Sequence, residues 1–169
     1  DDNFITAMIV EAREFVERVT GRALITQTIT EYFDSFPVGV SSALASRVIG
    51  LYIGPVISIA SDGISYIPDG GNPSSYTVWD NTGNAKFFLD SFSGGRGIGP
   101  ARICKKEGVE WPVIETYTNS VKVVYSAGYG SSAANVPGPL KRAMYRLIGR
   151  WYYNPEETND FELVADLLN

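Results

Sequence analysis

The start of the chain carries apolar side chains every three or four residues, with polar side chains between them. This spacing places the apolar side chains on one side of a helix. They are Ile5, Met8, Ile9, Ala12, Phe15, Val16 and Val19. Asp1, Asp2 and Asn3 offer oxygens that can cap the first turn, and Gly21 is typical of the residue that follows a helix. The pattern predicts an amphipathic helix over residues 4–20.

The helical spacing ends near residue 23, and a threonine-rich alternating segment follows. Within residues 24–36, Ile25, Ile29 and Phe33 are assigned to one face, with Gln27 and Glu31 between them. Such alternation indicates a half-buried strand, which Pro37 would end.

Further strand patterns continue to residue 125. Residues 56–67 predict one or two strands, and Pro68-Asp69-Gly70-Gly71 has the composition of a turn. The segments 76–79 and 86–89 flank Asn81-Thr82-Gly83-Asn84, which predicts a hairpin. Residues 120–125 predict a last short strand. The middle of the chain is therefore expected to be a β-rich insert over residues 23–125.

The C-terminal part returns to helical spacing. Pro139 suits the first turn of a second helix, predicted over residues 139–153, and Asn154-Pro155 would end it. Its apolar side consists of Leu140, Ala143, Met144, Leu147, Ile148, Trp151 and Tyr152. A shorter helix is predicted over residues 159–168. Because the two long helices are both amphipathic, we expect them to pack against each other.

These elements predict an α+β fold. It consists of a small helical bundle, made from the N-terminal helix and the C-terminal helices, with the β-rich insert between them. No linker rich in Gly, Ser and Pro divides the chain, so residues 1–169 are expected to form a single domain. No apolar run approaches the ~20 residues that span a bilayer, and no membrane partner is expected.

Composition excludes several kinds of chemistry. The 169 residues include no histidine, the usual general base and the commonest metal ligand. The single Cys104 is expected to be a buried small hydrophobic side chain or an inert thiol. Carboxylate pairs are the remaining catalytic option, but Asp62, Asp69, Asp80 and Asp90 all lie beside turn residues, where aspartate caps the backbone. We therefore predict no catalytic, cofactor-binding or metal-binding residue.

Gly128-Tyr129-Gly130-Ser131-Ser132-Ala133 matches the G-x-G-x-x-A form of the dinucleotide fingerprint. A phosphate site requires a helix that opens at the last position of this motif. Pro137 and Pro139 place the helix start too late, so nucleotide binding is rejected.

Three arginines recur every four residues on the second long helix: Arg142, Arg146 and Arg150. One interpretation is a solvated face paired with Glu11, Glu14 or Glu17 of the first helix. The other is a strip that contacts an acidic protein surface or DNA phosphates. The net charge of −5 makes a protein contact the favoured version of the second interpretation.

The order of these segments resembles the head-tail connector (adaptor) proteins of long-tailed bacteriophages and gene transfer agents. The resemblance extends over nearly the whole chain. It rests on residues 12–28, Asp34-Ser35-Phe36-Pro37, residues 55–59, Trp111-Pro112, residues 119–130, residues 136–141 and the helix end Trp151-Tyr152-Tyr153-Asn154. The chain departs from the family in having Pro155-Glu156-Glu157 after this helix and no basic tail.

The resemblance implies a structural, non-enzymatic virion protein of the neck. Such proteins form a dodecameric ring beneath the portal protein, extend the DNA channel and carry the stopper or tail-completion protein. Packaged DNA would pass through without sequence-specific binding, and no cofactor is implied. The rival from another class is a β-rich module that binds carbohydrate through Tyr52, Tyr66, Tyr76 and Trp79, and an enzyme with carboxylate chemistry is third.

The resemblance also places the portal contact at the C-terminal end. The predicted helix there carries five apolar side chains within eight residues: Phe161, Leu163, Val164, Leu167 and Leu168. A helix this short is marginal alone in water, so it must either fold back onto its own bundle or bind a partner. We expect docking to the portal. The arginine row is expected to form an intersubunit or channel-facing strip in the ring.

Overall fold

The computed structural model describes residues 2–37, 45–91, 101–154, 156, 162 and 164–165. The chain divides into two compact units, which are described separately. Residues 1–26 and 128–169 form one, called here the helical unit, and residues 27–127 form the other, called the sheet unit. The β-rich insert predicted between the helices is thus confirmed, and it is a compact unit in itself.

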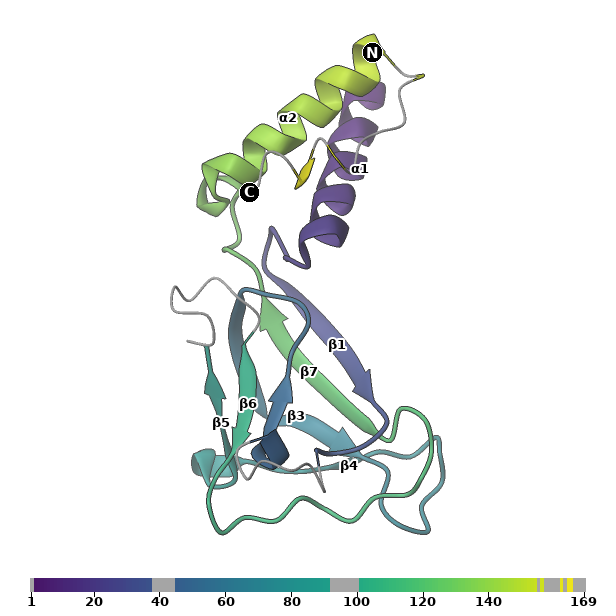
Figure 1. Ribbon diagram of the computed structural model, residues 1–169, viewed down its shortest axis with the longest axis vertical. Helices are drawn as coiled ribbons and strands as arrows, with labels where there is room; N and C mark the ends of the chain where they lie inside the picture. The colour runs from purple at the N-terminus through teal and green to yellow at the C-terminus, as the bar shows by residue number, and fades with distance from the viewer. Residues whose placement is uncertain are drawn as a thin grey trace. The chain divides into compact units, whose positions relative to one another are not determined.

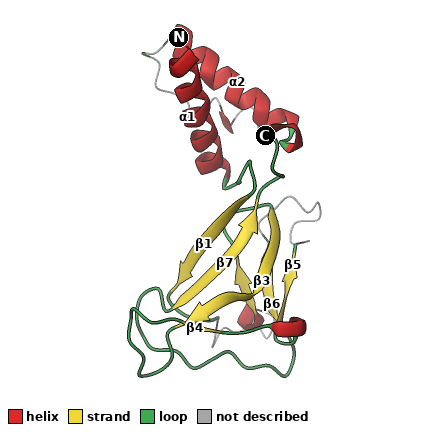
Figure 2. Cartoon of the chain, turned by 180° about the vertical axis from the view of Figure 1, so that it is seen from behind, coloured by secondary structure: helices red, strands yellow, loops and turns green. Residues whose placement is uncertain are grey.

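The helical unit contains two long helices that lie side by side (Figures 1 and 2). They are α1 (Asp2–Thr20) and α2 (Gly138–Tyr153), and the short 3₁₀ helix η3 (Ala133–Asn135) precedes α2. Both long helices and their mutual packing agree with the sequence prediction. Their shared core consists of Ala12, Val16, Leu24, Val136, Leu140, Ala143, Leu147 and Val164.

The third predicted helix, over residues 159–168, lies largely outside the described residues. Only Glu162, Val164 and Ala165 are described there, and all three are helical. The layout of an N-terminal helix and a C-terminal helix on either side of the insert is confirmed by α1 and α2. A complete three-helix bundle stays a prediction.

The ends of both long helices follow from local sequence. Gly21 has φ +62° after the last residue of α1, a conformation that glycine adopts without strain. Pro139 occupies the first turn of α2, where its missing N–H is not needed. At the other end of α2, the Asn154 N–H donates to the Arg150 carbonyl at 2.7 Å.

The sheet unit contains two antiparallel sheets (Figure 2). The first has the order β1 (Gln27–Phe33), β7 (Val121–Ala127), β3 (Val56–Tyr66), β4 (Thr77–Val78). The second has the order β2 (Val48–Gly50), β6 (Arg102–Lys105), β5 (Phe87–Asp90). The short 3₁₀ helices η1 (Ala45–Arg47) and η2 (Thr82–Asn84) lie in the connections. β7 is a central strand, and every second residue from Val121 to Ala127 is buried.

A cluster of aromatic rings fills the core of the sheet unit. Phe36 stacks on Trp111 with ring centroids 4.7 Å apart, and Trp79 stacks on Phe87 at 5.6 Å. Trp79 follows β4 in the first sheet, whereas Phe87 opens β5 in the second, so the cluster joins the two sheets. The Trp111 indole N–H donates to the Ser46 carbonyl at 2.8 Å, which satisfies the one polar atom of this ring.

The predicted hairpin of residues 76–79 and 86–89 is wrong. β4 pairs with β3, and β5 pairs with β6, so the two segments belong to different sheets. Asn81 holds the connection between the two segments, because its buried amide bonds to the backbone at the start of β5. Its Oδ1 accepts from the N–H groups of Lys86 and Phe87 at 2.7 and 3.0 Å, and its Nδ2 donates to the Phe87 carbonyl.

The face assignment within β1 also needs correction. Alternate residues of a strand share a face, so Glu31 lies on the same side as Ile29 and Phe33 rather than between them. The strand is shorter than predicted, covering Gln27–Phe33, and Glu31 is its one buried residue. A carboxylate therefore occupies the inner face of this strand.

Candidate interaction surfaces

Two of the four carboxylates considered for catalysis have structural roles. Asp80 accepts hydrogen bonds from the Thr82 backbone and hydroxyl, as a turn-capping aspartate does, and Asp90 pairs with Arg102 at 2.6 Å. Within the described ranges, no group of three or more His, Cys, Asp and Glu side chains is arranged to hold a metal ion. Among the same residues, no helix is long and apolar enough to cross a membrane.

Cys104 lies in β6 and is half-buried. Burial, with a smaller contribution from the Asp90 carboxylate, raises the pKa of its thiol. Because the thiolate is the reactive form, the raised pKa keeps this side chain unreactive at neutral pH.

The four aromatics proposed as a sugar platform do not form one surface. Trp79 is only 6% exposed and belongs to the aromatic core, so its assignment to a platform is wrong. Tyr66 packs against the same core at Phe36. The Tyr76 hydroxyl donates to the Asn119 carbonyl at 2.7 Å, and Tyr52 stacks on Phe33.

The glycines of the rejected dinucleotide motif serve chain packing. Gly128 has φ +135°, and a Cβ there would lie 2.6 Å from the backbone of Ile25 and Thr26. The two segments are joined by a hydrogen bond from the Thr26 N–H to the Gly130 carbonyl at 2.9 Å. α2 begins only at Gly138, so no helix N-terminus faces the motif.

The arginine row lies on the side of α2 away from its apolar neighbours. Arg142 and Arg146 are exposed, and Arg150 is half-buried. Neither Arg142 nor Arg146 forms an ion pair with a described residue. Of the α1 carboxylates considered as their partners, Glu17 instead pairs with Arg13 and accepts from the Leu24 N–H at 2.7 Å.

Five apolar residues were proposed for portal docking, and the structure describes the side chain of one of them, Val164. Val164 is fully buried and belongs to the core that α1 and α2 share. The side chains of Phe161, Leu163, Leu167 and Leu168 lie outside the described residues. Docking of the C-terminal segment to the portal stays a prediction. A portal contact through Val164 would require this side chain to leave the core that α1 and α2 share.

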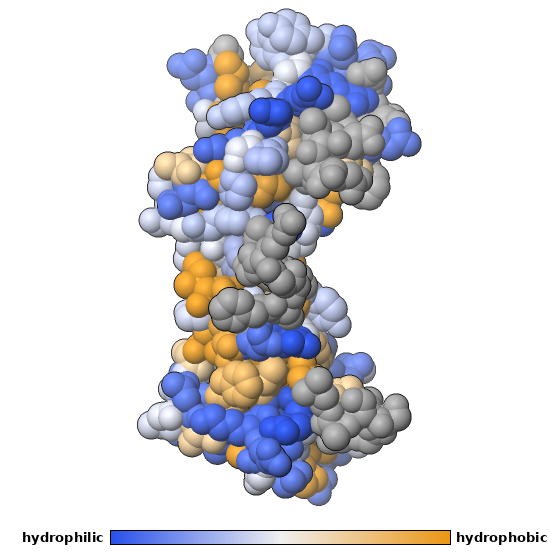
Figure 3. Space-filling model, turned by 60° about the vertical axis from the view of Figure 1, so that its left-hand side comes forward, coloured by the Kyte–Doolittle hydropathy of each residue, from blue (hydrophilic) through white to orange (hydrophobic). Residues whose placement is uncertain are grey.

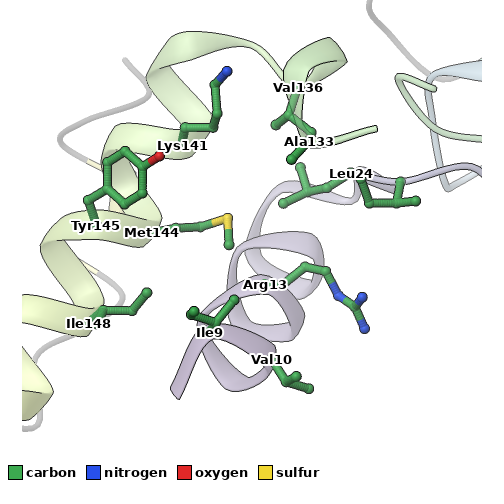
Figure 4. Close-up of a pocket in the computed structure, with 11 residues that line it drawn as sticks. Ile9, Val10, Arg13, Leu24, Ala133, Val136, Lys141, Met144, Tyr145 and Ile148 are labelled. Carbon is green, nitrogen blue, oxygen red and sulfur yellow. The ribbon is translucent and has the colours of Figure 1, made fainter. Parts of the chain in front are cut away.

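A groove of about 320 Å³ runs along the helical unit. Figure 4 shows its floor, where Met144 of α2 points toward α1 and Ile148 lies one turn further along. The α1 side is formed by Ile9 and Val10, which are 47% and 43% exposed. Arg13 and Lys141 supply the charged groups of the lining, and the Arg13 guanidinium points away from Met144.

A second feature, in the sheet unit, was missed by the sequence analysis. The buried Glu31 carboxylate accepts hydrogen bonds from the N–H groups of Tyr52 and Ile53 at 2.9 and 3.1 Å. The Tyr125 hydroxyl donates to the same carboxylate at 2.5 Å. Burial, followed by the hydrogen bond to Glu31, raises the pKa of Tyr125. This network fixes the segment that presents Tyr52, which is 71% exposed.

Strongly hydrophilic side chains lie on both units, on the face that Figure 3 shows. In the sequence of the helical unit, positive and negative charges are unevenly distributed. α2 carries Lys141 and the three arginines and no carboxylate, whereas residues 156–169 carry five carboxylates and no basic side chain. The chain has 19 acidic and 14 basic side chains, so the C-terminal segment alone accounts for the net charge of −5.

The sequence matches no family model, and no curated protein matches it. Solved structures share its fold. A chain in the neck of an empty gene transfer agent particle, computed with sixfold symmetry, has a TM-score of 0.70. It is 16% identical, and the match covers 99% of this chain and 78% of that chain.

Two further structures agree. A chain in the virion of a native gene transfer agent has a TM-score of 0.68 at 18% identity, covering 99% of this chain and 77% of that one. A chain in the neck of a native particle, computed with twelvefold symmetry, has a TM-score of 0.65 at 18% identity, covering 96% and 80%. The resemblance predicted from sequence is thus confirmed as a likeness of fold.

Proposed function

We propose that this chain is a structural component of a virion neck. Copies of it form a ring beneath the portal protein, extend the channel through which DNA passes, and provide the platform for a stopper or tail-completion protein. The protein acts by holding these partners together, with no enzymatic step.

The likeness of fold carries this proposal. It extends over 96–99% of the chain, so both the helical unit and the sheet unit take part in it. The similar chains come from particles whose necks were computed with sixfold or twelvefold symmetry. A ring of repeated subunits is the assembly that such symmetry describes.

The charge of the chain supports a channel that DNA traverses without binding. Affinity for DNA arises mainly from basic side chains that neutralise phosphates. With 19 acidic and 14 basic side chains, the chain lacks the overall excess of basic residues that strong DNA binding requires.

We place the portal contact at the C-terminal segment. Phe161, Leu163, Leu167 and Leu168 supply its apolar side chains, and the polar residues 156–160 separate them from α2. Val164 is buried against α1 and α2, so a docked segment would exchange this contact for one with the portal.

Co-expression with a cognate portal protein tests the proposal. The two proteins should co-purify, and negative-stain electron microscopy should show a ring of this chain on one end of the portal. A variant lacking residues 156–169 should leave the portal without the added ring. Recovery of this chain as a free monomer, with bare portals, would contradict the proposal.

A further inference from the structure

The groove of the helical unit is an apolar surface with positive charge at one end. None of the residues that line it is a carboxylate. Met144, Ile148 and Ile9 supply apolar side chains. Lys141 lies one turn before Met144 and Arg13 lies one turn after Ile9, so both basic residues are toward the end of the groove where α1 ends and α2 begins (Figures 1 and 4). Such a groove fits a helix that is apolar at one end and acidic at the other.

Both basic side chains can accept a carboxylate from a partner. Lys141 forms no ion pair with a described residue. The Nε of Arg13 lies 3.8 Å from the Glu17 carboxylate, and this nitrogen has no hydrogen-bond acceptor among the described residues. A guanidinium has five N–H donors, so Arg13 can bind a second carboxylate while it stays near Glu17.

A surface with the matching order of side chains lies on α1 of the same chain. Phe4, Ala7, Glu11 and Glu14 follow one another at steps of three or four residues, so they form one ridge along the helix, called here the α1 ridge. All four are exposed, and neither glutamate forms an ion pair with a described residue. The α1 ridge is thus apolar toward the start of α1 and acidic toward its end, in the same direction as the groove.

The α1 ridge and the groove lie on different sides of the helical unit. Glu11 follows Val10 of the groove by one residue, and Glu14 follows Arg13 by one residue. Each such step turns the side chain by about 100° around the helix axis. A chain cannot place its own ridge in its own groove, because α1 belongs to both. Two different surfaces that fit each other join identical copies head to tail, and such contacts can close into a ring.

Ring symmetry brings these two surfaces to the same level. Rotation about the ring axis carries each residue to the next subunit without any rise along the axis. Glu11 and Glu14 are within two residues of Arg13, so their backbones are at most about 6 Å from it. The glutamates of one subunit therefore lie level with Arg13 of the next subunit to within about 6 Å, whatever the tilt of α1.

We propose that the α1 ridge of one subunit docks into the groove of the next subunit in the ring. Phe4 and Ala7 cover the apolar end of the groove, and the two glutamates face its two basic side chains. The inference rests on the proposed ring and names the contact between its subunits. None of the lining residues follows Ile148, so the contact leaves the C-terminal segment available to the portal.

Pairs of introduced cysteines test the contact directly. Cys104→Ser first removes the one native thiol. A chain that also carries Ala7→Cys and Ile148→Cys is then assembled on the portal protein and treated with a short bismaleimide. Denaturing electrophoresis should show a series of covalent multimers, because each subunit can be joined to both of its neighbours. Chains with only one of the two introduced cysteines are the controls and should stay monomeric.

Labelling of the chain with Ile148→Cys alone shows what covers the groove. Its thiol should react with a maleimide about tenfold more slowly in the assembled ring than in the free chain, because a thiol must be exposed to react. A slow reaction in the free chain would mean that the chain covers its own groove, and it would overturn the proposal. Protection in a ring that gives no covalent multimers would mean that another protein covers the groove.

Charge reversal tests the electrostatic part of the contact. E11K/E14K sets two positive charges against Arg13 and Lys141, so the affinity of one subunit for the next should fall about tenfold at about 0.05 M salt and less at about 0.5 M salt. Ring formation on the portal protein is measured by electron microscopy and sedimentation. Adding R13E/K141E to the same chain should restore the rings, because the two surfaces then carry opposite charges again.

A matched control carries the same charge change in turns of the sheet unit. D69K/E107K alters two exposed carboxylates there and should form rings like the wild-type chain. Circular dichroism should show that all the variants are folded. Absence of rings from the wild-type chain would contradict the proposed function itself, before any variant is compared.

Three results would overturn the docking while leaving the ring intact. In the first, rings form but the two cysteines never join subunits. In the second, a chain with one introduced cysteine gives covalent dimers, which would indicate that two copies of the same surface face each other. In the third, E11K/E14K forms rings as readily as the wild-type chain at low salt.

Discussion

Replacing Glu31 with alanine should destabilise the sheet unit strongly. The carboxylate is 9% exposed and is the acceptor for the N–H groups of Tyr52 and Ile53 and for the Tyr125 hydroxyl. Alanine leaves three donors without this partner. Each hydrogen bond to a charged group contributes about 1.5–3 kcal/mol. The Ile53 N–H and the Tyr125 hydroxyl keep second partners, because the N–H also donates to the hydroxyl at 3.2 Å and the hydroxyl also donates to the Ile53 carbonyl at 3.0 Å. The total loss should therefore be about 3 kcal/mol, less than the sum of three such bonds.

The expected loss is large enough to measure by urea unfolding. With a slope of about 2 kcal/mol per molar urea, a loss of about 3 kcal/mol lowers the midpoint by about 1.5 M. Trp79 and Trp111 lie in the core of the sheet unit, so their fluorescence reports its unfolding. Glu31→Gln keeps one acceptor oxygen and should lose about 1 kcal/mol.

Glu107→Ala provides the control, because Glu107 is exposed and its removal should change stability by less than about 0.5 kcal/mol. If Glu31→Ala also loses less than about 0.5 kcal/mol, the buried network does not stabilise the unit, and the reasoning from its hydrogen bonds is refuted.

Three further predictions concern single side chains. Burial and the hydrogen bond to Glu31 raise the pKa of Tyr125 above its ordinary value of 10.0, so the free energy of unfolding should fall as the pH rises above 10. Tyr125→Phe should flatten this alkaline decline, and a variant with the same pH profile as the wild-type chain would contradict the prediction. Gly128→Ala should lower the thermal midpoint, because a Cβ would lie 2.6 Å from Ile25 and Thr26; a wild-type midpoint would disprove the close approach. Val164→Ala should lower the unfolding free energy of the helical unit by about 2 kcal/mol, as measured by circular dichroism. An unchanged unfolding free energy would mean that Val164 does not hold the C-terminal segment in the core of α1 and α2.

The helices were predictable because local signals agree with the packing. Apolar spacing, Gly21 after α1 and Pro139 at the start of α2 all act within a few residues. Their packing against each other followed from the fact that each has one apolar side. Sequence reasoning therefore found the elements of the helical unit and their order.

The sheet pairing was not predictable from local patterns. β4 and β5 look like hairpin strands in sequence, but their partners are β3 and β6. The amide of Asn81, which turns the chain between the sheets, resembles any other turn asparagine until its buried contacts are known. Alternation alone does not identify a partner strand.

Glu31 was missed for a different reason. A carboxylate in an alternating segment is normally assigned to the solvent side. Its burial depends on three donors, two of them about 20 residues away and one on β7. Strict counting by two would have placed Glu31 beside Ile29 and Phe33, and this is the signal that could have found it.

The candidate surfaces were predicted in part. The arginine row was visible as an i,i+4 repeat, and the structure adds that Arg142 and Arg146 are exposed. The C-terminal segment was identified by its apolar side chains, but the burial of Val164 in its own unit depends on tertiary packing. The groove beside Met144 arises from two helices distant in sequence, so no local pattern indicates it.

Cryo-electron microscopy of particles that contain this chain tests the central claim most directly. The account predicts density for the chain at the junction of head and tail, in a closed ring that contacts the portal on one side and the next neck component on the other. Density for the chain elsewhere in the particle, or a single copy without rotational symmetry at that junction, would contradict it.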